Sequence, residues 1–113
     1  MKNIFDCFAL EQTEATQKYV QRAWEMYAEY KDQIFSVKSL EIFQKISKKA
    51  FGNRAVIDVK NVPLTDGCNN TFKISARQHL TFEGAQVESL EHRDGFINYE
   101  IRPVSDKITL NFN

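Results

Sequence analysis

One stretch, Thr71 to Phe82, limits the fold of this chain more than any other part of its sequence. It runs TFKISARQHLTF, so that apolar and polar side chains alternate along most of its length. A period of two is typical of a β-strand with one face buried and the other in water. Such a strand needs neighbours for its backbone hydrogen bonds, and the sequence therefore predicts a sheet.

The strand is also unusually long. Twelve residues at about 3.4 Å each would span roughly 40 Å, well beyond an ordinary strand. We predict a bend at Gln78, the one polar side chain on the apolar face, because a buried amide needs partners that a bend or bulge can supply. The opposite face carries the polar row Thr71, Lys73, Ser75, Arg77, His79 and Thr81.

The first half of the chain is predicted to be helical. No glycine or proline occurs from Leu10 to Phe35, where apolar residues recur at three and four positions. This stripe consists of Val20, Ala23, Tyr27, Tyr30 and Ile34, with Tyr19 and Trp24 beside it. A second helix is predicted from its N-cap Ser36 to the glycine stop at Gly52.

The second half is predicted to be sheet. Short β-branched or alternating segments lie at 54–62, 71–82, 86–92, 96–102 and 107–112, separated by turn-forming residues. No connection is long enough for a crossover helix. The predicted fold class is α+β, with two N-terminal helices packed on one face of a C-terminal antiparallel meander sheet of four to five strands. One domain is expected over residues 1–113, with the helical half at about 5–52 and the sheet half at about 54–113.

Turn chemistry predicts the register of the hairpins. A two-residue turn at Asp94-Gly95 would place His92 opposite Ile97 and Leu90 opposite Tyr99. A three-residue loop at 83–85 would place Phe82 opposite Gln86. This register puts Glu88 on the apolar side and Val87 on the polar side, so a bulge is expected near them.

Charge and hydropathy exclude several classes of protein. Fifteen basic and fifteen acidic residues cancel, although residues 36–60 carry six Lys/Arg against two Asp/Glu. No apolar run approaches the roughly 18 residues that span a bilayer, and we expect a soluble, cytoplasmic protein. The cysteines, Cys7 and Cys68, are too few and too far apart for a disulfide framework, so both are expected to remain thiols.

The sequence contains little that supports catalysis. The best nucleophile and base would be Cys68 with His79 or His92, and the ordinary explanation of each histidine is structural. Neither histidine has a second one at metal-ligand spacing, and the four glycines are scattered singly. We expect no enzyme, no cofactor and no metal site.

The favoured hypothesis is a small protein-binding module, such as an inhibitor or an immunity-type protein that occupies the surface of a partner protein. The expected partner-binding residues are Lys73, Arg77 and His79, because the polar row has three potential cations and no acid before Glu83. The last predicted strand, KITLNF, could lie at a sheet edge, where it could pair with a second copy of the chain to form a homodimer.

The sequence is compatible with two alternative functions. A nucleic-acid-binding protein would use the basic segment 38–60, above all Lys45, Lys48, Lys49 and Arg54, together with Lys73 and Arg77. A small-ligand binder would have its pocket between the first helix and the sheet, lined by Trp24, Tyr27 and Tyr30. The sequence does not identify the partner or the ligand.

Overall fold

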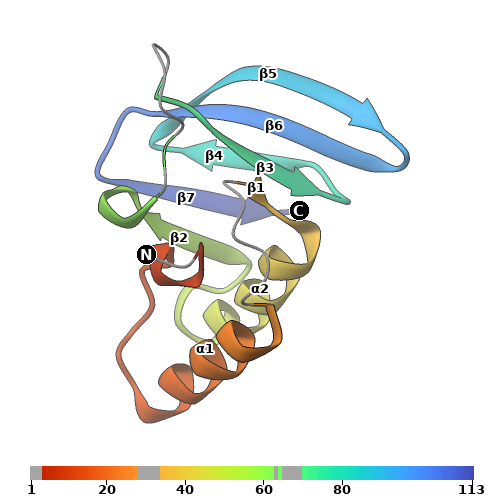
Figure 1. Ribbon diagram of the computed structural model, residues 1–113. Coiled ribbons are helices and arrows are strands. Elements are labelled where there is room, and N and C mark those ends of the chain that lie inside the picture. Colours follow the sequence, from red (N-terminus) through yellow and green to blue (C-terminus); the bar gives the residue numbers. More distant parts are fainter. Residues whose placement is uncertain (1–3, 28–33, 63, 65–69) are drawn as a thin grey trace.

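The computed structural model describes residues 4–27, 34–62, 64 and 70–113, and it confirms the predicted combination of two helices with antiparallel sheets (Figure 1). Helical elements are the short 3-10 helices η1 (Ile4–Cys7) and η2 (Val59–Asn61), with α1 (Glu14–Tyr27) and α2 (Val37–Phe51). The strands are β1 (Ile34–Phe35), β2 (Arg54–Asp58), β3 (Phe72–Ala76), β4 (Leu80–Glu83), β5 (Ala85–Arg93), β6 (Phe96–Pro103) and β7 (Lys107–Phe112).

Helix α2 begins and ends where the sequence predicts. Ser36 is extended, and its Oγ accepts a hydrogen bond of 3.2 Å from the backbone N–H of Ser39. At the other end, the Gly52 N–H donates to the Lys48 carbonyl, and Gly52 has the positive φ that glycine adopts easily. The helix buries Leu40 and Phe43 in the core.

The first helix is shorter than predicted. Helix α1 covers Glu14–Tyr27, residues 28–33 lie outside the described part, and Ile34–Phe35 form β1 instead of helix. Strand β1 pairs with β3 in parallel, and Phe35 is fully buried between the rings of Phe8 and Phe72. Helical periodicity in the sequence could not reveal this pairing, because its partner strand lies almost forty residues later.

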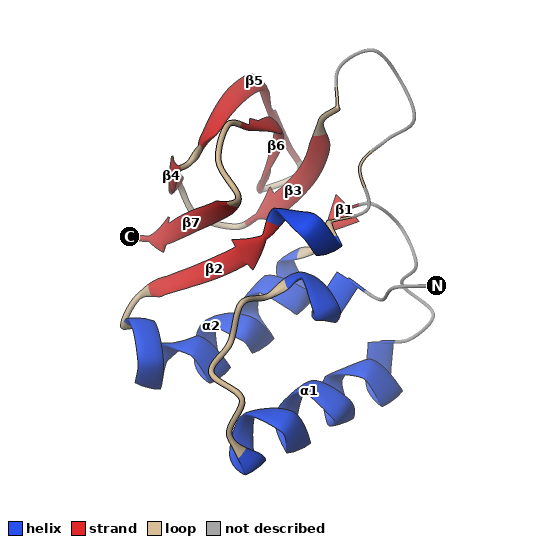
Figure 2. Cartoon of the chain, turned by 90° about the vertical axis from the view of Figure 1, so that its left-hand side faces the viewer, coloured by secondary structure: helices blue, strands red, loops and turns tan. Residues whose placement is uncertain are grey.

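Helix α1 packs on α2 and η1 instead of on the sheet. Figure 2 shows α1 beyond α2, on the side away from the strands. In the described part of its apolar stripe, Ala23 is buried and Val20 packs against the core, whereas Tyr19, Trp24 and Met26 beside the stripe are exposed. The location predicted for a ligand pocket, between helix 1 and the sheet, is therefore wrong. The side chains of Tyr27 and Tyr30, which were expected to line it, lie outside the described residues.

The strands form two sheets instead of one meander. In the described part of the chain, one sheet has the order β1-β3-β6-β5 and the other has the order β2-β7-β4. Terminal strand β7 lies in the middle of its sheet, between β2 and β4, so the expectation that it forms an edge is wrong. Buried hydrophobic residues of both sheets, α2 and η1 make one cluster.

The alternating stretch passes from one sheet to the other. The predicted bend is confirmed, because β3 ends at Ala76 and β4 begins at Leu80. Our reason for it was wrong, since Gln78 is exposed at the bend and not buried. A second corner follows at Gly84, where β4 leads directly into β5. Strand β4 pairs with β7, and the predicted hairpin that placed Phe82 opposite Gln86 is therefore wrong.

The second hairpin follows the predicted register. His92 lies opposite Ile97 and Leu90 opposite Tyr99, around a turn in which Asp94 and Gly95 both have positive φ. The register shifts between Val87 and Ser89, which confirms the expected bulge.

Candidate protein interface

Strand β5 is an edge strand with little cover. Among the described strands it pairs only with β6, and eight of its nine residues are exposed. Its outer edge therefore offers backbone N–H and C=O groups to another strand. The apolar side chains of Val87 and Leu90 are 42% and 45% exposed. We refer to Val87, Leu90 and His92 as the β5 ridge.

The β5 ridge continues the core-facing side of the sheet into solvent. Val87, Leu90 and His92 are opposite the buried β6 residues Ile101, Tyr99 and Ile97. Residues opposite each other on antiparallel strands point to the same face. The ridge is thus a part of the apolar face that the described residues leave uncovered.

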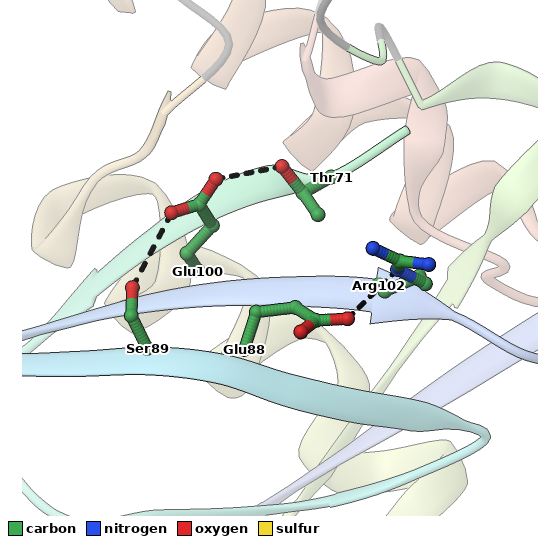
Figure 3. A network of polar contacts seen from close by, with 5 residues as sticks. All are labelled: Thr71, Glu88, Ser89, Glu100 and Arg102. Atoms are coloured by element: carbon green, nitrogen blue, oxygen red, sulfur yellow. Dashed lines mark hydrogen bonds and ion pairs between the residues drawn. The ribbon is translucent and has the colours of Figure 1, made fainter. Parts of the chain in front are cut away.

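The bulge determines which side chains belong to the ridge. Val87 pairs with Ile101, whereas Ser89 pairs with Glu100, and Glu88 is the extra residue between them. Without the bulge, strict alternation from Leu90 would turn Val87 to the polar face. The Glu88 carboxylate lies on the polar face instead, with Oε1 2.7 Å from Arg102 Nε (Figure 3).

A polar network holds the opposite, outer face of this sheet together (Figure 3). The Thr71 hydroxyl donates to Glu100 Oε1 at 2.8 Å, and the Ser89 hydroxyl donates to Glu100 Oε2 at 3.3 Å. Glu100 on β6 therefore joins β5 to the residue before β3. With the ion pair of Glu88 and Arg102, these bonds fix β5 against its neighbours, so that its free edge is pre-organised.

The structure divides the predicted row of three cations. Lys73 is exposed on the outer face, opposite Glu100 in the register of β3 and β6. Arg77 Nε lies 3.7 Å from Glu41 Oε1, and its Cζ lies 6.0 Å from the centre of the Phe96 ring. Each of these cations has an acidic side chain near it, so this part of the row carries little unbalanced positive charge.

His79 lies apart from the other two. The chain bends after Ala76, and the His79 ring lies 5.9 Å from the ring of His92, on the ridge side of β5. Sequence reasoning placed His79 with the outer polar row, because it followed one alternation through a strand that in fact ends at Ala76.

The basic segment stays open to solvent. Lys45, Lys48 and Lys49 on α2 and Arg54 at the start of β2 are all exposed. None of the four takes part in an ion pair with another described residue. Lys48 and Lys49 lie in the last turn of α2, where cations also complement the negative end of the helix dipole.

Two shallow cavities lie on the helical side. One of about 730 Å³ is bordered by the chain after η1, the end of α2 and the adjoining ends of β2 and β7, and its charged residues are Asp6, Glu11, Lys49, Asp58 and Lys107. The other, of about 320 Å³, lies between η1 and α1, where Phe5, Leu10, Val20 and Trp24 line it. Trp24 does line a cavity, although not one that borders the sheet.

The described residues do not assemble the catalytic pair that the sequence suggested. Cys7 is buried, and its Sγ donates to the Asn61 carbonyl at 2.7 Å. Cys68 lies outside the described residues. In the described part of the chain, no three His, Cys, Asp or Glu side chains gather as a metal site, and no helix there is long and apolar enough to cross a membrane.

Comparisons of the chain with protein-family models, with curated proteins and with solved structures found no match.

Proposed function

We propose that this protein is a non-catalytic protein-binding module, and that its partner adds an extended strand to the free edge of β5. The observation that carries the proposal is the exposure of nearly all of β5, with Val87 and Leu90 uncovered on the side that continues the core. Strand addition would pair the free backbone groups, while alternate apolar side chains of the partner would cover the ridge.

The bulge favours a different protein over a second copy as the partner. Antiparallel pairing of β5 with itself about Leu90 would place Glu88 opposite His92. Glu88 lies on the outer face and His92 on the ridge side, so the two copies would not match beyond the central residues. A partner strand with its own register avoids this conflict. Inhibitors and immunity-type proteins act in this way, by occupying a surface of another protein.

Photo-crosslinking can identify the partner. A photoreactive amino acid at position 90 in the native cell should capture a protein, whereas the same amino acid at position 104 should not. Val104 is a matched control, because it is 67% exposed and lies in the turn after β6.

Leu90→Asp is then expected to weaken binding of the captured protein by about 30-fold, or about 2 kcal/mol, since it places a charge in a covered apolar contact. Val104→Asp should change the Kd less than about twofold, and both variants should keep their free energy of unfolding within about 1 kcal/mol. Isothermal titration calorimetry and urea denaturation measure these quantities. Equal losses of affinity in the two variants would contradict strand addition at β5.

The predicted row supplies a second arm of the same experiment. In Lys73→Glu with Arg77→Glu, the charge of the outer face is reversed and the ridge is left intact. If this double variant keeps full affinity for the captured protein while Leu90→Asp loses affinity, the partner binds at β5. The reverse result would locate it on Lys73 and Arg77 and would refute the ridge.

Nucleic-acid binding is a second candidate function, supported by the solvent-open group of Lys45, Lys48, Lys49 and Arg54. If duplex DNA binds there, log Kd should depend linearly on log salt concentration, with a slope of about 0.9 per phosphate contacted. Replacing the three lysines by Gln should reduce that slope by about 2 to 3, whereas Lys18→Gln on α1 should not change it. Fluorescence titrations from about 50 mM salt upward test this. Absence of binding to DNA and RNA at the lowest salt would eliminate this candidate.

A further inference from the structure

The two histidines of this protein meet at the junction of its two sheets. They are the only histidines in the chain, and they lie thirteen residues apart. His79 belongs to the bend between β3 and β4, and His92 is near the end of β5. Their ring centres are 5.9 Å apart, with an angle of 66° between the ring planes, and both side chains are exposed.

Several contacts fix the backbone on both sides of this pair. The backbone N–H of Leu80, next to His79, donates to the Tyr99 hydroxyl at 3.1 Å, and that bond is buried. The His79 carbonyl accepts from Asn113 Nδ2 at 3.4 Å. On the other side, His92 is held in the β5–β6 ladder opposite Ile97. Only the side-chain torsions of the two imidazoles are left to adjust.

We propose that His79 and His92 together bind one divalent transition-metal ion of the zinc class. Imidazole nitrogens are preferred ligands of Zn²⁺, Ni²⁺ and Cu²⁺. With a Zn–N bond of about 2.0 to 2.1 Å and a ring radius of about 1.2 Å, two imidazoles on one tetrahedral ion have centres roughly 5.3 Å apart. The observed 5.9 Å is about 0.6 Å longer, a difference that rotation of the two exposed side chains can close.

The site has two protein ligands and open positions. No third His, Cys, Asp or Glu joins the pair in the part of the chain that the structure describes. Glu91 is next to His92 in sequence, but its carboxylate lies 3.3 Å from Arg93. Water fills the remaining positions of the bound ion. Since the ion joins the β3–β4 bend to β5, it should also resist separation of the two sheets.

Calorimetric titration of the whole protein with ZnCl₂ at pH 7.5 tests the site, with Cys68→Ser as the background because a thiol would compete for zinc. We expect one ion per chain with a Kd in the micromolar range. His79→Gln and His92→Gln should each weaken binding at least tenfold, whereas Glu91→Gln should leave the Kd within about twofold. Side-chain NMR should show both imidazoles shifting together as zinc is added.

A second readout is independent of affinity. Saturating zinc should raise the Tm of the Cys68→Ser protein, EDTA should reverse the rise, and neither histidine variant should show it. Retention of full zinc affinity in either histidine variant would overturn the proposal, because a single imidazole or another group would then hold the ion. Absence of any zinc binding at millimolar concentration would overturn it as well.

Discussion

Gly84→Ala is expected to lower the free energy of unfolding by about 3 to 5 kcal/mol. Gly84 has a φ of +83°, where an alanine costs about 1 to 2 kcal/mol. A Cβ at this position would also collide with the backbone carbonyl oxygen of Lys107, and it would lie 3.2 Å from Ser105 Cβ. The strand cannot move away easily, because the Gly84 carbonyl accepts the Val104 N–H at 2.9 Å.

Gly95→Ala is the matched control for this prediction. Gly95 has nearly the same φ, +81°, but an added Cβ there has no atom within 4 Å. Gly95→Ala should therefore lower the free energy of unfolding only by the cost of the positive φ, about 1 to 2 kcal/mol. Urea denaturation followed by circular dichroism measures both variants. Similar losses in the two would mean that the corner between the sheets tolerates a side chain, contrary to the structure.

Phe43→Ala should destabilise the protein by about 3 to 5 kcal/mol, since removal of a buried ring leaves a cavity. Phe43 is fully buried, and its ring stacks on Phe8, with centres 3.6 Å apart, and on Phe5 at 5.2 Å. It connects α2 to η1 and to the chain that follows η1. A decrease in Tm of about 10 °C or more is expected for a domain of this size.

Phe96→Ala removes a ring of the same size from the surface. Phe96 is 37% exposed, and the Arg77 guanidinium carbon lies 6.0 Å from the centre of its ring. This change should cost about 1 kcal/mol, the size of an exposed cation–π contact with some apolar area. Thermal and urea unfolding of the two variants side by side provide the comparison. A loss for Phe43→Ala as small as for Phe96→Ala would show that η1 does not pack on α2 in solution.

The hairpin of β5 and β6 could be predicted from sequence because its information is local. Asp94-Gly95 specifies the turn, and the turn specifies the register of Leu90 and His92. The bulge near Glu88 was also predictable, since Val87 and Glu88 broke the alternation. The helix α2 was predictable for the same reason, because its cap and its glycine stop are both next to it in sequence.

The candidate site was only partly predictable. Alternation places Lys73 on the outer face, because Lys73 lies within β3, which runs only to Ala76. Arg77 already follows the end of that strand. Alternation could not show that His79 turns away or that the β5 ridge lacks cover. Both features depend on the order of the strands in the two sheets. The sequence of β5 has no regular apolar alternation, so it could not indicate that β5 is an edge strand.

The sequence by itself determined the local structure, through turns, caps and alternating side chains whose partners lie within a few residues. The tertiary structure decided how the strands are distributed between the two sheets. It also placed β7 in the centre of its sheet and made Ile34–Phe35 a strand. The physical reason is that long-range pairing depends on the shared burial of distant residues such as Phe35, Phe72 and Leu110. A single hydrophobic pattern is compatible with several partners, and only packing selects one of them.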